Sequence, residues 1–284
     1  MIRSLCMTDK ILLVTNGCTE SWATVEYAVG MAKTMKLPLT LLGVVEEMDE
    51  EHPVEEIFSR AVTLFREKKL DYDLQLVNGD TEEVLSEIGW DEDTYLFVGS
   101  LGRSHFRHWL MGRSFRKILE NVPSPIFYTR EARLPIKKLL ICFGGLDYMG
   151  RAEEIGLEIG KRTGAEVQFL HVIPPVESEY LPAQEINQKQ EIPLTEKSAL
   201  TLKNAKKHAK EQGIKSNIIV RQGNVVQQIL EELDVQRYDL ICMGSSFSNP
   251  DSLRRLYAPN VTAEIAEAVN CPVLTARAIP VHSA

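Results

Sequence analysis

An internal repeat limits what this 284-residue chain can fold into more than any other feature. Five short segments of the first half recur in the same order in the second half, at offsets that grow from 128 to 147 residues. The paired segments are 10–17 with 138–145, 39–45 with 167–173, 77–80 with 221–224, 93–100 with 238–245, and 124–127 with 271–274. Since chance explains five collinear matches poorly, the sequence predicts two copies of one fold. We expect the copies to span residues 1–133 and 134–284, joined by a charged connector that contains Pro135.

Short apolar runs alternate with segments of helical periodicity within each copy. Residues 22–32, for example, carry apolar side chains at the spacing of an amphipathic helix. Strands that are apolar on both faces and alternate with helices are typical of a parallel sheet covered on both sides. We therefore expect an α/β fold with two doubly wound domains, each having five parallel strands and a ligand site at their carboxyl ends. Most of the growth in offset falls in residues 174–197, a stretch rich in Pro, Gln and Glu that predicts a long surface loop.

Composition limits the kinds of partner that the chain can bind and the cellular compartment in which we expect it. The chain has 32 basic and 40 acidic residues, a net charge of −8, which argues against binding to duplex nucleic acid. No apolar run approaches the roughly 18 to 20 residues of a membrane span, and the first residues do not resemble a signal peptide. The five cysteines are scattered without a Cys-x-x-Cys pair and are interpreted as reduced packing residues. We expect a cytoplasmic protein with no membrane association.

A glycine pattern follows the fourth expected strand of the first copy. Gly99, Gly102 and Gly112 have the spacing Gly-x2-Gly-x9-Gly, between an apolar run and a helical pattern that stops at Pro123. Glycine lets backbone N–H groups approach a ligand closely, and a helix N-terminus favours an anion such as phosphate. No acidic residue lies between Gly99 and Lys117, whereas several basic ones do: Arg103, Arg107, Arg113 and Arg116. A basic loop in an acidic chain predicts a polyphosphate cradle.

On these residues the chain resembles the universal stress protein family, in a tandem two-domain arrangement. The glycine pattern carries the resemblance most sharply, together with Pro125 thirteen residues after Gly112 and before a last strand. The resemblance implies strand order 3-2-1-4-5 in each domain, ATP held at this loop with or without Mg²⁺, and a regulatory role in stress. It also implies the binding residues: the three glycines line the phosphates and ribose, Val98 borders the base, Val44 contacts adenine, and Asn16 stands where an aspartate meets base and ribose.

Two positions depart from the family pattern. Asn16 keeps a hydrogen-bonding side chain but loses the charge of aspartate. Arg113 stands where the family has serine or threonine, and Ser114 follows one place later. A guanidinium can hold phosphate through several donors or can fill the pocket in its place, and both alternatives stay open. Arg103, Arg113 and Ser114 complete the expected binding set.

The second copy has a degenerate loop. Gly244 remains, but Phe247 and Pro259 replace the second and third glycines. Proline has no N–H and phenylalanine blocks backbone approach, so we expect no phosphate cradle there and assign this copy a structural or regulatory role. By the resemblance, residues 126–129 and 273–276 pair and join the halves into an intramolecular pseudo-dimer. Dimerisation of the whole chain is left open.

Function has three alternatives on this reading. The first is a regulatory protein that binds ATP or a related adenine nucleotide in its first copy. The second is a nucleotide-free interaction module with both loops vestigial, and the third is a slow ATP-hydrolysing enzyme. No P-loop, nucleophile elbow or Cys/His pair is present and no catalytic base can be named, so turnover is unsupported. The acidic run 46–51 is interpreted as a solvated loop, with Mg²⁺ chelation as its alternative.

Overall fold

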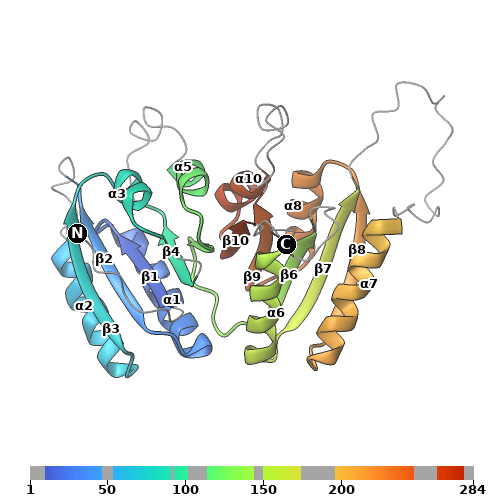
Figure 1. Cartoon of the computed structure of the whole chain (residues 1–284), viewed down its shortest axis with the longest axis horizontal. Helices are drawn as coiled ribbons and strands as arrows, with labels where there is room; N and C mark the ends of the chain where they lie inside the picture. The colour runs from blue at the N-terminus through green and yellow to red at the C-terminus, as the bar shows by residue number, and fades with distance from the viewer. Residues whose placement is uncertain are drawn as a thin grey trace, which may run out of the picture.

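The structure is a computed structural model, which describes residues 10–46, 54–90, 93–101, 114–143, 150–173, 196–245 and 261–277. Ten strands form one sheet in the order β3-β2-β1-β4-β5-β10-β9-β6-β7-β8 (Figure 1). The strands of the first half are β1 (Lys10–Thr15), β2 (Leu39–Val45), β3 (Tyr72–Asn78), β4 (Thr94–Gly99) and β5 (Ile126–Thr129). Those of the second half are β6 (Lys138–Phe143), β7 (Glu166–Ile173), β8 (Ser216–Gln222), β9 (Leu240–Ser245) and β10 (Val273–Arg277).

Within each half the strands run parallel in the order 3-2-1-4-5, which confirms the expected doubly wound α/β topology. The order of the second half is the same when β6 to β10 are counted from one to five. The two halves meet where β5 and β10 pair in antiparallel fashion, with Phe127 opposite Leu274 at the centre of the register. The expected joining of the halves is therefore confirmed, and it merges the two sheets into one.

Helices cover both faces of the sheet. One face carries α1 (Trp22–Met35), α2 (Val54–Glu67), α6 (Arg151–Thr163) and α7 (Glu196–Glu211), and the other carries α3 (Thr81–Glu87), α5 (Ser114–Asn121), α8 (Val225–Val235) and α10 (Val261–Ala268). Alternate residues of a strand enter opposite layers: Ile11 and Leu13 join the α1 side, Leu12 and Val14 the α5 side. No helix of the described residues is long and apolar enough to cross a membrane.

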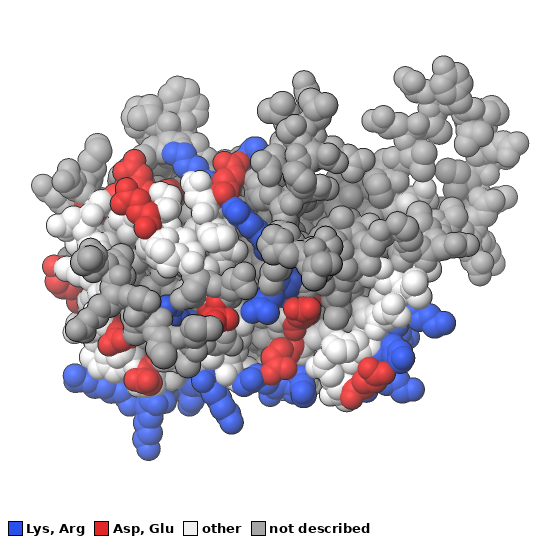
Figure 2. Space-filling model, in the orientation of Figure 1, with Lys and Arg blue, Asp and Glu red and all other residues white. Residues whose placement is uncertain are grey.

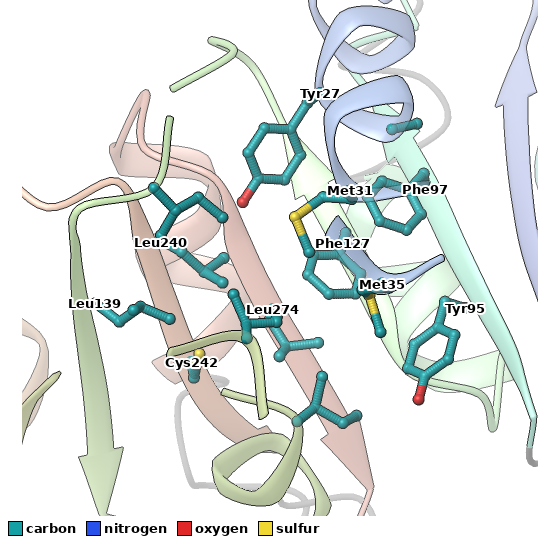
Figure 3. Close-up of a cluster of buried hydrophobic side chains, with 14 of the residues drawn as sticks. Tyr27, Met31, Met35, Tyr95, Phe97, Phe127, Leu139, Leu240, Cys242 and Leu274 are labelled. Atoms are coloured by element: carbon teal, nitrogen blue, oxygen red, sulfur yellow. The ribbon is translucent and has the colours of Figure 1, made fainter. Parts of the chain in front are cut away.

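The apolar layer on the α1 side runs without interruption from one half to the other (Figure 3). Tyr27 and Met31 of α1 lie beside Phe127 of β5, and Leu274 of β10 faces them from the second half. The rings of Phe97 and Phe127 stack with centroids 4.4 Å apart and planes 7° from parallel. Burial of this shared layer stabilises the two halves as a unit, because separating them would expose it to water.

Two arginines at equivalent strand ends each close a helix of the other half. Arg277 donates from Nη2 to the carbonyls of Leu119 (3.0 Å) and Glu120 (2.6 Å) at the end of α5. Arg130, its counterpart 147 residues earlier, donates from Nη1 to the carbonyl of Glu267 (2.8 Å) at the end of α10. The last carbonyls of a helix have no partner within the helix and carry partial negative charge, so both arginines meet groups that favour a cation.

We expect Arg277→Ala to lower the free energy of unfolding by about 1 to 2 kcal/mol, because it leaves the carbonyls of Leu119 and Glu120 without this charged donor. Urea titration measures the change. The matched control is Arg116→Ala, since Arg116 makes an exposed pair with Glu120 and should contribute less than about 0.5 kcal/mol. Equal losses in the two variants would contradict a stabilising cap between the halves.

Candidate functional site

The first half has its topological switch point between β1 and β4. The chain leaves β1 toward β2 on one side and leaves β4 toward β5 on the other. The loops that follow these two neighbouring strands therefore diverge, and ligands of doubly wound folds bind in the crevice that results. Asn16 follows β1 here, and Ser100 and Leu101 follow β4. The structure thus brings together one expected site residue and the beginning of the glycine pattern.

A tight hydrogen-bonded turn carries the chain from β1 into α1. The hydroxyl of Thr15 lies 2.7 Å from that of Ser21 and accepts from the N–H of Gly17 at 3.0 Å. Ser21 also donates its hydroxyl to the carbonyl of Cys18 at 2.7 Å. Gly17 has φ of 89°, a conformation that glycine adopts without the cost other residues bear. The turn fixes Asn16 at the mouth of the switch point.

Asn16 ties the two loops together. Its side chain is 2% exposed, donates from Nδ2 to the carbonyl of Leu101 at 2.8 Å, and accepts at Oδ1 from the N–H of Cys18 at 3.4 Å. The Cys18 thiol adds a contact of 3.3 Å with the carbonyl of Ser100. An ionised aspartate, the family's residue at this position, has no proton to donate to the carbonyl of Leu101. The change to asparagine therefore removes a charge but adds a hydrogen-bond donor. Sequence reasoning missed Cys18, since nothing local marks its contact 82 residues away.

Val44 and Val98 lie fully buried in the apolar layer beneath α3 and α5. Val44 is on β2 and Val98 on β4, with β1 between them. Both therefore enter the same apolar layer near the carboxyl ends of the strands. Leu101 and Phe115 belong to this layer as well. The valines are therefore close to the switch point, and contact with a base stays a prediction for both.

Gly99, the first glycine of the pattern, is required for internal packing. A Cβ at this position would collide with the hydroxyl of Thr24 and would lie 2.6 Å from the carbonyl of Thr129. Thr24 donates to that same carbonyl at 3.1 Å, and this bond fastens α1 to the end of β5. From the motif alone, the missing side chain would be explained by close approach of a ligand. In the structure it makes room for Thr24 and for the carbonyl of Thr129.

Five further residues were expected at the site, and only one of them, Ser114, belongs to the described residues. Gly102, Arg103, Gly112 and Arg113 lie outside the described residues. Ser114 is the first residue of α5, a helix that has no acidic residue in its first turn. The helix N-terminus thus follows the glycine pattern in the chain, as the sequence predicts.

A group of carboxylates occupies the same edge of the sheet at the ends of β2 and β3. Ligand atoms of Glu46, Asp80 and Glu82 lie within 4.8 Å of one another. Glu46 accepts from the hydroxyl (2.6 Å) and the N–H (3.3 Å) of Thr81, and Asp80 caps α3 by accepting from the N–H of Glu82 at 3.1 Å. Anionic side chains at a helix N-terminus are favoured by its dipole.

Glu46 is 5% exposed, so the expectation of a solvated acidic loop is wrong at this residue. Its carboxylate is held in the interior by the hydrogen bonds from Thr81. The rest of the acidic run, residues 47–51, lies outside the described residues. Asp80 and Glu82 were not singled out from the sequence, although an Asp before a helical pattern is a recognisable capping signal.

In the second half, α6 is the counterpart of α1, and its first turn contains a buried acid. Glu153 lies in the first turn of α6, is 5% exposed, and corresponds to the apolar Val25 of α1. Its Oε2 has no hydrogen-bond partner among the described residues. Burial raises the pKa of this carboxyl from 4.5 to about 7, while hydrogen bonds from backbone N–H groups, including that of Gly150, act in the opposite direction. Sequence reasoning missed this buried acid, because a glutamate three residues after a helix N-cap is usually exposed.

Comparison with known proteins assigns the same family to both repeats. The model of the universal stress protein family matches residues 7–130 and again residues 135–277. A universal stress protein of Methanocaldococcus jannaschii is 28% identical over 141 residues, covering 50% of this chain and 82% of its own. Universal stress protein YxiE of Bacillus subtilis is 26% identical over 149 residues, covering 49% and 98%. The solved structure of a universal stress protein from Archaeoglobus fulgidus shares the fold, with a TM-score of 0.66 at 16% identity over 95% of this chain and 97% of its own.

Gly99→Ala should lower the free energy of unfolding by about 1 to 3 kcal/mol, because the new methyl group overpacks the junction with Thr24 and Thr129. The matched control is Gly244→Ala, the equivalent glycine of β9, where a Cβ would meet no atom of the described residues within 4 Å. We expect that change to stay within about 0.5 kcal/mol. Urea unfolding without added ligand compares the two, and equal effects would remove the packing role of Gly99.

Glu153→Gln should stabilise the protein at neutral and alkaline pH. Between pH about 4.5 and 7 the folded protein keeps a proton on Glu153 that the unfolded chain has released, so wild-type stability falls as pH rises through this window. Glutamine has no such proton to lose, so the variant should exceed wild type by about 3 kcal/mol at pH 8 and match it near pH 4. Urea titrations across this pH range measure the difference, and a difference independent of pH would exclude Glu153 as its source.

Proposed function

The chain belongs to the universal stress protein family, and on that basis we propose that its first repeat, residues 1–133, binds ATP or a related adenine nucleotide as a regulatory ligand in a stress response. The observation that carries the proposal is where the glycine pattern lies. Gly99 ends β4 beside β1, and α5 begins at Ser114, directly after the last positions of the pattern. We assign the polyphosphate to N–H groups of the glycine pattern and to the N-terminus of α5, since this combination suits a polyphosphate at a switch point.

Each expected residue has a distinct part in this proposal. The N–H groups from Gly99 to Gly112 hold the phosphates, and Arg103, Arg113 and Ser114 add donors beside them. Asn16 donates one amide hydrogen to Leu101, and we assign its second amide hydrogen to the base or ribose. Val44 and Val98 supply the apolar side of the adenine site. Mg²⁺ that arrives with the triphosphate takes its ligands from phosphate oxygens and water, so we assign it no protein ligand.

The nucleotide acts by changing conformational populations. Binding favours the arrangement in which the loop is ordered around the phosphates, and a partner then distinguishes the two states. No described residue stands out as a base for hydrolysis, so we assign no turnover. The second repeat, residues 134–284, serves as the structural partner of the first through β5 and β10. We place the protein in the cytoplasm, where a reducing environment suits its four described cysteines, which are buried and in the thiol form.

Nucleotide binding is tested by thermal and urea unfolding with and without ATP. ATP at a hundredfold excess over Kd should raise the free energy of unfolding by about 2.7 kcal/mol. Gly102→Val should abolish this gain and leave the unliganded stability unchanged, because its side chain blocks approach to the loop. The matched control is Phe247→Ala at the equivalent position of the second repeat, which should retain the full gain.

Two outcomes would replace the proposal. Absence of stabilisation by any adenine nucleotide, with none released from freshly purified protein on denaturation, would favour the nucleotide-free interaction module. Slow Mg²⁺-dependent phosphate release that is lost together with binding in Gly102→Val would instead indicate an enzyme. One observation favours the interaction module as second candidate: Asn16 is already bonded to Leu101 and Cys18, so the loops hold together without a ligand.

A further inference from the structure

The strand β3 is an outer edge of the ten-stranded sheet and exposes two neighbouring leucines. One side of β3 pairs with β2, and no described strand pairs with the other side (Figure 1). Leu74 is 43% exposed and Leu76 is 54% exposed, and both point to the same face of the strand. The other large exposed apolar side chains of the described residues are scattered singly on other elements: Leu134, Leu200 and Val235.

The equivalent edge of the second half is covered. Ile218 and Val220 of β8 correspond to Leu74 and Leu76, but they are partly buried and pack against the apolar layer. The helix α7 packs on β8, whereas its shorter counterpart α2 packs mainly on β2 and meets β3 at Tyr72, whose ring centroid lies 5.3 Å from that of Phe65. Among the described residues, the first half therefore has no helix over Leu74 and Leu76, whereas the second half covers the equivalent positions with α7.

The β3 edge lacks the devices by which proteins prevent strand addition. Its seven residues keep an uninterrupted register with β2, from Leu39 opposite Tyr72 to Val45 opposite Asn78, so the strand has no bulge. It contains no proline and no lysine, and its one charge is Asp73. Long, regular edges that expose apolar side chains are suited to pairing with another strand.

We propose that this edge pairs with the β3 edge of a second copy of the chain, antiparallel and across a two-fold axis through Gln75. Gln75 is the midpoint of β3, so this register pairs all seven residues of both strands. It sets Leu74 of one copy opposite Leu76 of the other, twice by symmetry. A two-fold axis perpendicular to the sheet preserves its faces, so the four leucines form one cluster that shields them from water.

Charge selects the antiparallel arrangement and a second copy as the occupant. Asp73 comes opposite Val77, so no like charges face each other within the pairing. The segment before β3 has mixed charge, with Lys68 and Lys69 between Glu67 and Asp71, whereas the segment after it is acidic, with Asp80 and Glu83. The antiparallel pairing brings each lysine pair to the acidic end of the other copy. Lysine and arginine side chains project from the lower edge of the left half in Figure 2, and acidic side chains gather at its upper left. Parallel pairing would instead bring the two acidic ends together.

Leu74→Lys and Leu76→Lys test the surface by equilibrium sedimentation over a range of concentrations. Wild type should be a dimer in the micromolar range, and each variant should raise the dimer Kd by about tenfold or more, because every substituted leucine enters the cluster twice. Gln222→Lys on the outer strand β8 adds the same charge to the other edge and should leave the Kd unchanged. Both leucines are exposed, so urea unfolding at low concentration should show an unaltered monomer. A wild-type monomer at 100 micromolar, or a dimer that persists unweakened in both variants, would overturn the proposal.

A disulfide experiment tests the register. In the Cys6→Ser background, Gln75→Cys places two thiols opposite each other across the two-fold axis, within reach of a disulfide. Asp73→Cys is the control, because the register separates its two copies by about 13 Å along the strand. Mild oxidation should give a covalent dimer with Gln75→Cys and a monomer with Asp73→Cys. Equal cross-linking of both, or of neither, would exclude this register. The proposal does not depend on nucleotide binding, so ATP should leave both results unchanged.

Discussion

The antiparallel pairing of β5 with β10 is the contact on which the rest of the structure depends. A doubly wound domain of this order ends in β5, a strand of four residues whose outer edge would otherwise be open. Pairing removes that edge from both halves, and it places Phe127 and Leu274, each fully buried, at the centre of a shared apolar layer. Arg130 and Arg277 then close the helix ends that this contact brings together. The switch points of both halves are therefore held in one sheet by this pairing.

The two switch points share a backbone plan but differ in chemistry. At the first, Gly99 is packed tightly by Thr24, and Asn16 fastens the two loops. At the second, no described residue would crowd a Cβ at Gly244, and the buried acid Glu153 stands in place of Val25. Because burial raises the pKa of Glu153 to about 7, this acid keeps its proton in the folded protein below that pH, so the second switch point has a buried neutral acid where the first has an apolar side chain. Apolar layers support the same fold in both copies, while the polar residues at the strand ends differ between them.

Periodicity was enough to predict most of the fold. Apolar alternation in runs such as 10–15 and 39–45, together with helical spacing between them, defines parallel strands covered on both faces, and these patterns act over a few residues. The repeat itself doubled the information, since each half supports the assignment of the other. Of the candidate site, the sequence located Asn16 and the glycine pattern beside each other at the switch point. It did not show what their side chains contact, because those partners are distant in the chain.

The sequence by itself therefore determined the α/β class and the presence of two copies, since these follow from local patterns of apolar residues and from the repeat. The strand order and the strands that join the halves came from the resemblance to the family. Only the tertiary structure decided that Asn16 donates to Leu101, that Gly99 yields space to Thr24, that Glu46 and Glu153 are buried, and that Leu74 and Leu76 remain exposed. Each of these depends on how elements far apart in sequence pack. Burial and hydrogen bonding are properties of that packing, and no short stretch of residues encodes them.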